Sequence, residues 1–112
     1  MRLGFACRGI GRAIREETSL RTQVAIAAAF ALVLAWLRPP FGWIMACAGA
    51  AAAVIAAELM NTSLERLADR LHPEIHPAVE MAKDCAAGAV LILALAAAGI
   101  GAATVAVALR WI

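Results

Sequence analysis

Charged residues are scarce in this chain, and long uncharged runs take their place. Only 16% of the 112 residues are charged, 64% are hydrophobic, and the mean hydropathy is +0.84. About 25% of the residues in a soluble domain are charged, so this balance excludes an ordinary soluble protein. We therefore predict a membrane protein, and we expect no nucleic-acid partner.

Cysteine pairs and glycine-rich nucleotide motifs are also missing. Cys7, Cys47 and Cys85 stand apart without CxxC or Cys/His spacing, which argues against disulfides and a zinc site. No GxxxxGK[ST] or GxGxxG occurs, so the phosphate-binding loops of soluble nucleotide enzymes are excluded. His72 and His76 lack a second set of ligands, and we interpret them as turn residues.

Three apolar segments stand out along the chain: 24–37, 41–57 and 85–109. About 20 helical residues are needed to cross the roughly 30 Å of hydrocarbon in a bilayer. The third segment is long enough to cross the membrane. The second is long enough when it is extended to Asn61, and the first only when the flanking residues from Leu20 are included. Three spans in one copy of the chain bury too little surface to shield several polar groups from lipid, so we expect an oligomer.

The resulting fold prediction is an all-α membrane protein with a single domain, residues 1–112. Its helices are an amphipathic surface helix (4–18) and three membrane spans (20–37, 41–70 with a cytoplasmic extension, and 78–109). A face of small residues on the second span allows close approach in lipid: Ala46, Gly49, Ala50 and Ala53. We expect shallow grooves along this face that admit an acyl or prenyl chain.

The amino-terminal segment has the pattern of a basic amphipathic helix at the membrane surface. Phe5, Ile10 and Ile14 share one side of this helix, while arginines occupy the other sides. A signal peptide is the weaker alternative, because Glu16 and Glu17 interrupt the basic region and no small-residue cleavage site follows.

Basic residues are distributed unevenly about the spans. Of the ten, eight lie before the first span or between the second and third, and only Arg38 and Arg110 lie on the other side. By the positive-inside rule, we expect the amino terminus and residues 62–84 in the cytoplasm and the carboxyl terminus outside.

A ladder of polar side chains continues the second apolar segment. Glu58, Asn61, Glu65 and Asp69 fall in a narrow stripe on one helical face, because successive helical residues turn by about 100°. Residues 41–57 carry no charge, so Glu58 emerges directly from an apolar run. A carboxylate costs a few kcal/mol in hydrocarbon, which makes Glu58 a candidate functional group.

Further polar residues are expected at the same membrane face: Glu17, Glu74, His76, Lys83 and Asp84. Paired carboxylates near a lysine suit Mg²⁺ with phosphate oxygens, since carboxylates are hard oxygen ligands and lysine supplies a positive charge. The alternative is that the ladder is only the solvated end of a helix. In that case Arg66 and Arg70 pair with the ladder at i,i+4 spacing or across protomers.

Three blocks of sequence carry a resemblance to a known family: ELMNTSLERLAD at 58–69, EIHP at 74–77 and AKDCAAGAVL at 82–91. They are similar, in order and separation, to the signature of the prokaryotic diacylglycerol kinases. FACRGI at 5–10 and REETSLR at 15–21 resemble the same family. The short amino terminus and the HP-containing loop are more similar to the Gram-positive undecaprenol kinase type than to the enterobacterial type.

This resemblance implies a homotrimer in the bacterial cytoplasmic membrane, with active sites shared between protomers. It implies that Glu58 is the catalytic base and that Asn61 orders the site. Glu17 and Glu65 would hold Mg²⁺ on ATP, and a further set would contact the nucleotide: Glu74, His76, Lys83 and Asp84.

Two functions fit these residues. The first is an ATP-dependent lipid kinase that phosphorylates the hydroxyl of a membrane lipid, undecaprenol or diacylglycerol, with undecaprenol favoured. The second is a small proton-coupled transporter in which Glu58 carries the proton. A transporter needs charge at the midplane of the membrane, where this chain has none, so we favour the kinase.

Overall fold

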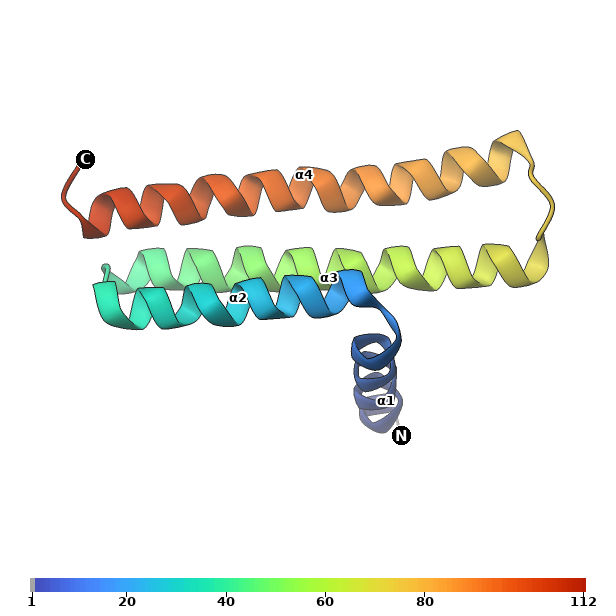
Figure 1. The fold of residues 1–112 in the computed structure, drawn as a ribbon, viewed down its shortest axis with the longest axis horizontal. Helices are drawn as coiled ribbons and strands as arrows, with labels where there is room; N and C mark the ends of the chain where they lie inside the picture. The colour runs from blue at the N-terminus through green and yellow to red at the C-terminus, as the bar shows by residue number, and fades with distance from the viewer. Residues whose placement is uncertain (1) are drawn as a thin grey trace.

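The computed structural model describes residues 2–112, which form four α-helices: α1 (Arg2–Glu16), α2 (Thr18–Leu37), α3 (Phe41–Leu71) and α4 (Pro77–Ala108). These residues include no β-strand. The helices α2, α3 and α4 are each long and apolar enough to cross a membrane, which confirms the prediction of three candidate spans. They run side by side, and α1 leaves the bundle at a steep angle (Figure 1).

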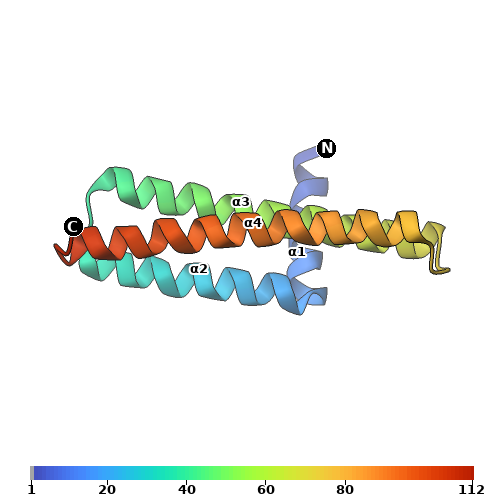
Figure 2. The same ribbon diagram turned by 90° about the horizontal axis from the view of Figure 1, so that it is seen from above.

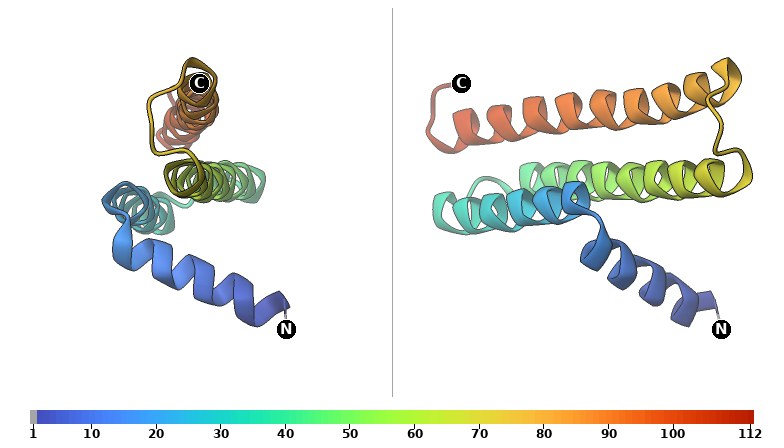
Figure 3. Two further views of the ribbon diagram at one scale, coloured as in Figure 1. Left: turned by 90° about the vertical axis from the view of Figure 1, so that its right-hand side faces the viewer. Right: turned by 45° about the vertical axis from the view of Figure 1, so that its right-hand side comes forward.

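The reversal between α2 and α3 follows from the residues that join them. Arg38 adopts a left-handed conformation with φ of 53°, and its backbone N–H bonds to the carbonyl oxygen of Leu34. Pro39 and Pro40 come next, and proline lacks the N–H that continues a helix. The chain therefore turns sharply, and α3 returns beside α2 (Figure 3).

A histidine cap starts α4. His76 precedes the helix in an extended conformation, and its Nδ1 accepts a hydrogen bond of 3.0 Å from the backbone N–H of Ala78. Pro77 occupies the first helical turn, where its missing N–H is not needed. In the same loop, Nδ1 of His72 lies 3.0 Å from the carbonyl oxygen of Glu74. Both histidines thus have partners within the turn.

The central helix is α3, against which α2 and α4 both pack (Figures 1 and 3). Seen from above, α4 is drawn in front, between α2 and α3 (Figure 2). It has 31 residues and α4 has 32, whereas α2 has only 20. Eleven extra residues make α3 roughly 16 Å longer than α2, at about 1.5 Å per residue. The extra length of α3 and α4 lies together on the side of their connecting loop, beyond the start of α2 (Figure 1).

Few of the side chains from residue 2 to residue 112 are buried: Leu20, Leu34, Val54, Glu58 and Thr104. The hydroxyl of Thr104 donates to the carbonyl oxygen of Ile100 at 2.8 Å and lies 3.1 Å from Cys47 Sγ, so this buried polar group is satisfied. At most 17% of any candidate span is buried. Large apolar side chains therefore face outward, as suits helices that meet lipid or further protein.

A groove of about 260 Å³ lies where α2, α3 and α4 meet. Its α3 wall consists of Cys47, Ala51, Val54 and Ile55. The sequence predicts such a groove along Ala46, Gly49, Ala50 and Ala53. Ala46 and Gly49 are exposed within this chain, whereas Ala50 and Ala53 are half-buried, so a groove along that face stays a prediction.

Candidate active site

Glu58 is the only buried carboxylate among residues 2–112, with 7% of its surface exposed. The hydroxyl of Ser19 donates a hydrogen bond of 3.1 Å to its Oε1 atom. Ser19 lies in the first turn of α2, so Glu58 sits level with that end of the helix rather than at its middle. A buried carboxylate needs a hydrogen-bond donor, and a second helix provides one here.

The next turn of α3 carries Asn61, whose two amide atoms differ in their surroundings. Its Nδ2 donates to Glu65 Oε1 at 3.3 Å. Its Oδ1 is buried and has no hydrogen-bond partner within residues 2–112. An unpaired buried acceptor is rare in folded proteins, and this one lies between two carboxylates of the ladder.

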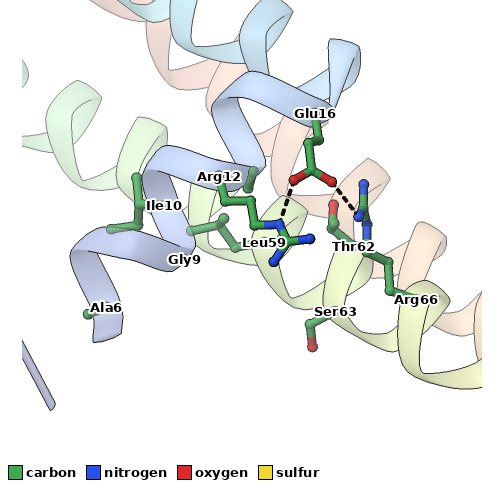
Figure 4. Close-up of a pocket in the computed structure, with 10 residues that line it drawn as sticks. Ala6, Gly9, Ile10, Arg12, Glu16, Leu59, Thr62, Ser63 and Arg66 are labelled. Carbon is green, nitrogen blue, oxygen red and sulfur yellow. Dashed lines mark hydrogen bonds and ion pairs between the residues drawn. The ribbon is translucent and has the colours of Figure 1, made fainter. Parts of the chain in front are cut away.

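An ion-pair cluster ties α3 to the junction of α1 and α2 (Figure 4). Nη1 of Arg66 lies 2.7 Å from Glu16 Oε1, and its Nη2 lies 2.5 Å from Glu17 Oε1. Arg12 approaches the other oxygen of Glu16 at 2.5 Å. The hydrogen bond from Arg12, and then that from Arg66, hold the pKa of Glu16 below its ordinary value. Within the described residues, Arg66 therefore pairs with Glu16 and Glu17 and not with the ladder at i,i+4 spacing, which was the alternative considered from the sequence.

Beside this cluster, a groove of about 670 Å³ opens between α1 and α3 (Figure 4). Its walls are mainly apolar or small: Ala6, Gly9, Ile10, Leu59, Thr62 and Ser63. Its charged end is formed by Arg12, Glu16 and Arg66.

The extensions of α3 and α4 are joined by a further ion pair. Nζ of Lys83 donates to Asp69 Oδ1 at 2.6 Å. Glu74 is exposed, and its Oε2 lies 3.6 Å from His72 Nδ1. Asp84 is exposed and forms no hydrogen bond or ion pair with another residue of the described chain.

A sequence comparison identifies the chain. Residues 4–105 match the family described as prokaryotic diacylglycerol kinase. The chain belongs to this family. It is therefore a lipid kinase, and its family implies ATP as the co-substrate and usually a divalent metal ion. No curated protein and no solved structure matches the sequence. The family gives no support to the transporter alternative.

The oxygen groups of this lipid kinase suit a divalent metal that is bound partly by phosphate. No group of three or more His, Cys, Asp or Glu side chains converges within residues 2–112. Mg²⁺ is usually held by only one or two carboxylates together with substrate phosphates and water, so a closed cage is not needed. The unpaired Oδ1 of Asn61, next to the Glu65 carboxylate, is a hard oxygen donor without a protein partner among these residues. The donor set thus fits the metal that the family implies.

Sequence reasoning missed four residues that contact the carboxylates of this region or belong to its ion-pair cluster: Arg12, Glu16, Ser19 and Arg66. The i,i+4 spacing of Arg12 and Glu16 is a signal that was available in the sequence. Ser19 and Arg66 gave no such signal, since each contacts a carboxylate 39 or 49 residues away in the chain. Only the packing of α1 and α2 on α3 reveals those contacts.

Proposed function

We propose that this lipid kinase transfers the γ-phosphoryl group of ATP to a lipid hydroxyl, with Glu58 as the general base. The observation that carries the proposal is the buried carboxylate held by Ser19 at the end of α2. Because Ser19 engages Oε1, the Oε2 atom is left to accept the proton of the attacking hydroxyl. At this depth a lipid headgroup and a water-soluble nucleotide can both reach the site.

Glu17 and Glu65 are the proposed metal-binding residues, and Asn61 adjoins Glu65. Their oxygens are ligands of the hard type that Mg²⁺ prefers, and Asn61 positions Glu65 through its Nδ2. When bound, Mg²⁺ neutralises charge on the transferred phosphoryl group. Exchange of Glu17 or Glu65 for Gln is expected to weaken Mg²⁺-dependent turnover, and the double variant to lose less than the sum of the two. Unchanged Mg²⁺ dependence in both single variants would contradict this assignment.

The proposed nucleotide contacts lie on the extensions of α3 and α4 and their loop: Glu74, His76, Lys83 and Asp84. Lys83 supplies the positive charge for phosphate, and Asp69 is its ion-pair partner within the chain. His76 already caps α4, so its role in the site includes fixing the start of that helix.

The kinase is proposed to act as a homotrimer in the bacterial cytoplasmic membrane. The charged extensions of α3 and α4 and the amino terminus then face the cytoplasm, with the carboxyl terminus outside. We propose that α1 lies at the membrane surface as an amphipathic helix, which is supported by its steep exit from the bundle and by the exposure of Phe5 and Ile10. The outward-facing apolar side chains of the spans support further protein or lipid around them.

Undecaprenol is the proposed acceptor in preference to diacylglycerol, though not exclusively. The groove between α2, α3 and α4 is apolar apart from Gln23, so it makes no specific contact with a lipid chain. Discrimination therefore falls to the headgroup, where a primary hydroxyl must reach Glu58. Competition between both lipids in mixed micelles tests this choice, and a strong preference for diacylglycerol would reverse it while leaving the kinase assignment intact.

The decisive experiment incubates purified protein with labelled ATP and a total lipid extract. Formation of a labelled lipid phosphate is expected, and the product identifies the acceptor. Glu58→Gln is the matched control, because the amide keeps the shape but cannot take the proton. Its turnover should fall by at least about 100-fold. A Glu58→Gln variant with turnover within about threefold of the parent would exclude Glu58 as the base.

A further inference from the structure

Arg66 engages the carboxylate that we propose as a metal ligand. Its Nη2 and Nε donate to the same oxygen, Glu17 Oε1, at 2.5 and 3.2 Å. Its Nη1 donates to Glu16 Oε1 at 2.7 Å. All three nitrogens of the guanidinium therefore point at carboxylate oxygens from the junction of α1 and α2.

Two carboxylates around one guanidinium present it with anionic oxygens, as a phosphate group does. Arginine binds both kinds of anion through parallel N–H donors, because its planar fork matches their geometry. Arg66 directly follows Glu65, the second proposed metal ligand. Phosphate held by a metal at Glu17 would lie near the guanidinium, because Arg66 contacts that carboxylate directly.

Arg66 occupies one oxygen of Glu17, so a metal ion on that carboxylate would lie beside a second cation. The two cations would repel each other across the carboxylate, because like charges a few Å apart interact unfavourably. Phosphate oxygens relieve the repulsion, since they bind the metal and the guanidinium together.

We propose that Arg66, which pairs with Glu16 and Glu17 within the chain, is a phosphate-binding residue of the kinase. When metal and nucleotide enter, Arg66 exchanges Glu17 for phosphate oxygens. This inference rests on the proposed role of Glu17 as a metal ligand.

The surroundings of Arg66 suit such an exchange. Half of its side chain is exposed, and ion pairs of exposed groups contribute little to stability, so leaving Glu17 is easy. The side chain borders the groove between α1 and α3, which gives it space to move. Arg12 keeps its own bond to Glu16, so that carboxylate retains a cationic partner when Arg66 departs.

Arg66→Gln tests the proposal through two affinities that should change in opposite directions. Mn²⁺ binding to the nucleotide-free protein, measured by electron paramagnetic resonance, should tighten by about threefold or more, because a competing cation leaves Glu17. Affinity for a non-hydrolysable ATP analogue with Mg²⁺, measured by equilibrium dialysis, should weaken by about fivefold or more, because a phosphate contact is lost. Arg66→Lys should retain part of the nucleotide affinity, since lysine keeps the charge but not the fork.

Arg12→Gln is the matched control, because it removes a cation from the same cluster without touching Glu17. Its Mn²⁺ affinity should stay within about twofold of the parent. If Arg66→Gln weakens the affinity for both Mn²⁺ and the ATP analogue, Arg66 only maintains the fold. If neither affinity changes, Arg66 is not a phosphate contact. Either result overturns the proposal. The kinase assignment is tested separately, by lipid phosphorylation with the parent protein. If the parent makes lipid phosphate, the assignment stands even when the proposal for Arg66 fails.

Discussion

At the scale of single residues, one hydroxyl determines which oxygen of Glu58 is free. Ser19 donates to Oε1 from another helix, so it orients the carboxylate without belonging to α3. A hydrogen bond to a charged group is worth about 1.5–3 kcal/mol, more than one between neutral partners. Ser19 is therefore a positioning residue for the proposed base.

Removal of this hydroxyl should slow catalysis rather than weaken substrate binding. We expect Ser19→Ala to lower kcat by about tenfold, which corresponds to about 1.4 kcal/mol, with little change in KM for ATP or lipid. Ser19→Thr keeps a hydroxyl and should restore most of the rate. Steady-state kinetics in detergent micelles measure both variants.

The control for this prediction is Thr22→Ala. Thr22 lies one turn further along α2, and its hydroxyl donates only to the backbone of Thr18. Loss of that hydroxyl should leave kcat unchanged. Equal losses in Ser19→Ala and Thr22→Ala would show that α2 is merely sensitive to substitution and that Ser19 does not orient Glu58.

At the scale of helices, the contact between α2 and α4 depends on a glycine. A Cβ atom at Gly101 would lie 3.3 Å from Cζ of Phe30, tighter than an ordinary contact. A Cβ at Gly99 would meet nothing within 4 Å. Gly101→Leu should therefore destabilise the bundle by about 1–3 kcal/mol, the usual effect of overpacking, while Gly99→Leu should not.

Thermal unfolding in detergent compares these two glycine variants directly. A lower transition temperature for Gly101→Leu alone is the expected result. Equal transition temperatures for both variants would mean that Phe30 moves aside freely and that α4 does not depend on a close approach there.

The docking of α1 on α3 should depend on pH through Glu16. Hydrogen bonds from Arg12 and Arg66 lower its pKa from the ordinary value of 4.5. A carboxyl group whose pKa is lowered in the folded state stabilises docking at any pH above its ordinary pKa. This stabilisation is lost as the pH falls through the folded-state pKa. We expect α1 to loosen only in acid below pH 4.5.

A spin label on Cys7 reports this loosening, once Cys47 and Cys85 have been replaced by alanine. Cys7 lies on α1 and is exposed, so it accepts the label without disturbing the bundle. Label mobility should rise in acid for the parent and should change less with pH in Glu16→Gln. A parent label whose mobility does not change with pH would mean that Glu16 does not hold α1.

Much of the helical framework was predictable because its signals are local. Long apolar runs, Pro39-Pro40 and the HPEIHP loop mark where helices begin and end without reference to anything distant. The polar stripe from Glu58 to Asp69 also followed from helical periodicity. The partners of that stripe were not predictable, because Ser19 and Arg66 meet their carboxylates only through the packing of separate helices.

At the scale of the whole molecule, the proposed trimer makes a prediction about mixed assemblies. If one site takes Glu58 and Lys83 from different protomers, two inactive variants should complement each other. Glu58→Gln and Lys83→Ala, unfolded together and reassembled, should recover up to about a quarter of the parental activity, because random mixing leaves that share of sites intact.

Each variant reassembled alone is the control for the mixing experiment and should remain inactive. Lys83 pairs with Asp69 of its own chain, so a site built within one protomer is the competing arrangement. A mixture as inactive as its components would support that arrangement and would contradict shared sites.

The unequal lengths of the helices tie the reaction to the thickness of the bilayer. The 20 residues of α2 reach about 30 Å, close to the hydrocarbon layer, and Ser19 near their start holds Glu58 at that depth. A thicker bilayer would submerge the carboxylate below the acceptor hydroxyl, and a thinner one would lift it into water, since hydrophobic mismatch shifts a helix relative to the headgroups. Turnover in vesicles of graded acyl-chain length should therefore pass through a maximum, whereas turnover independent of chain length would mean that the helices tilt to compensate.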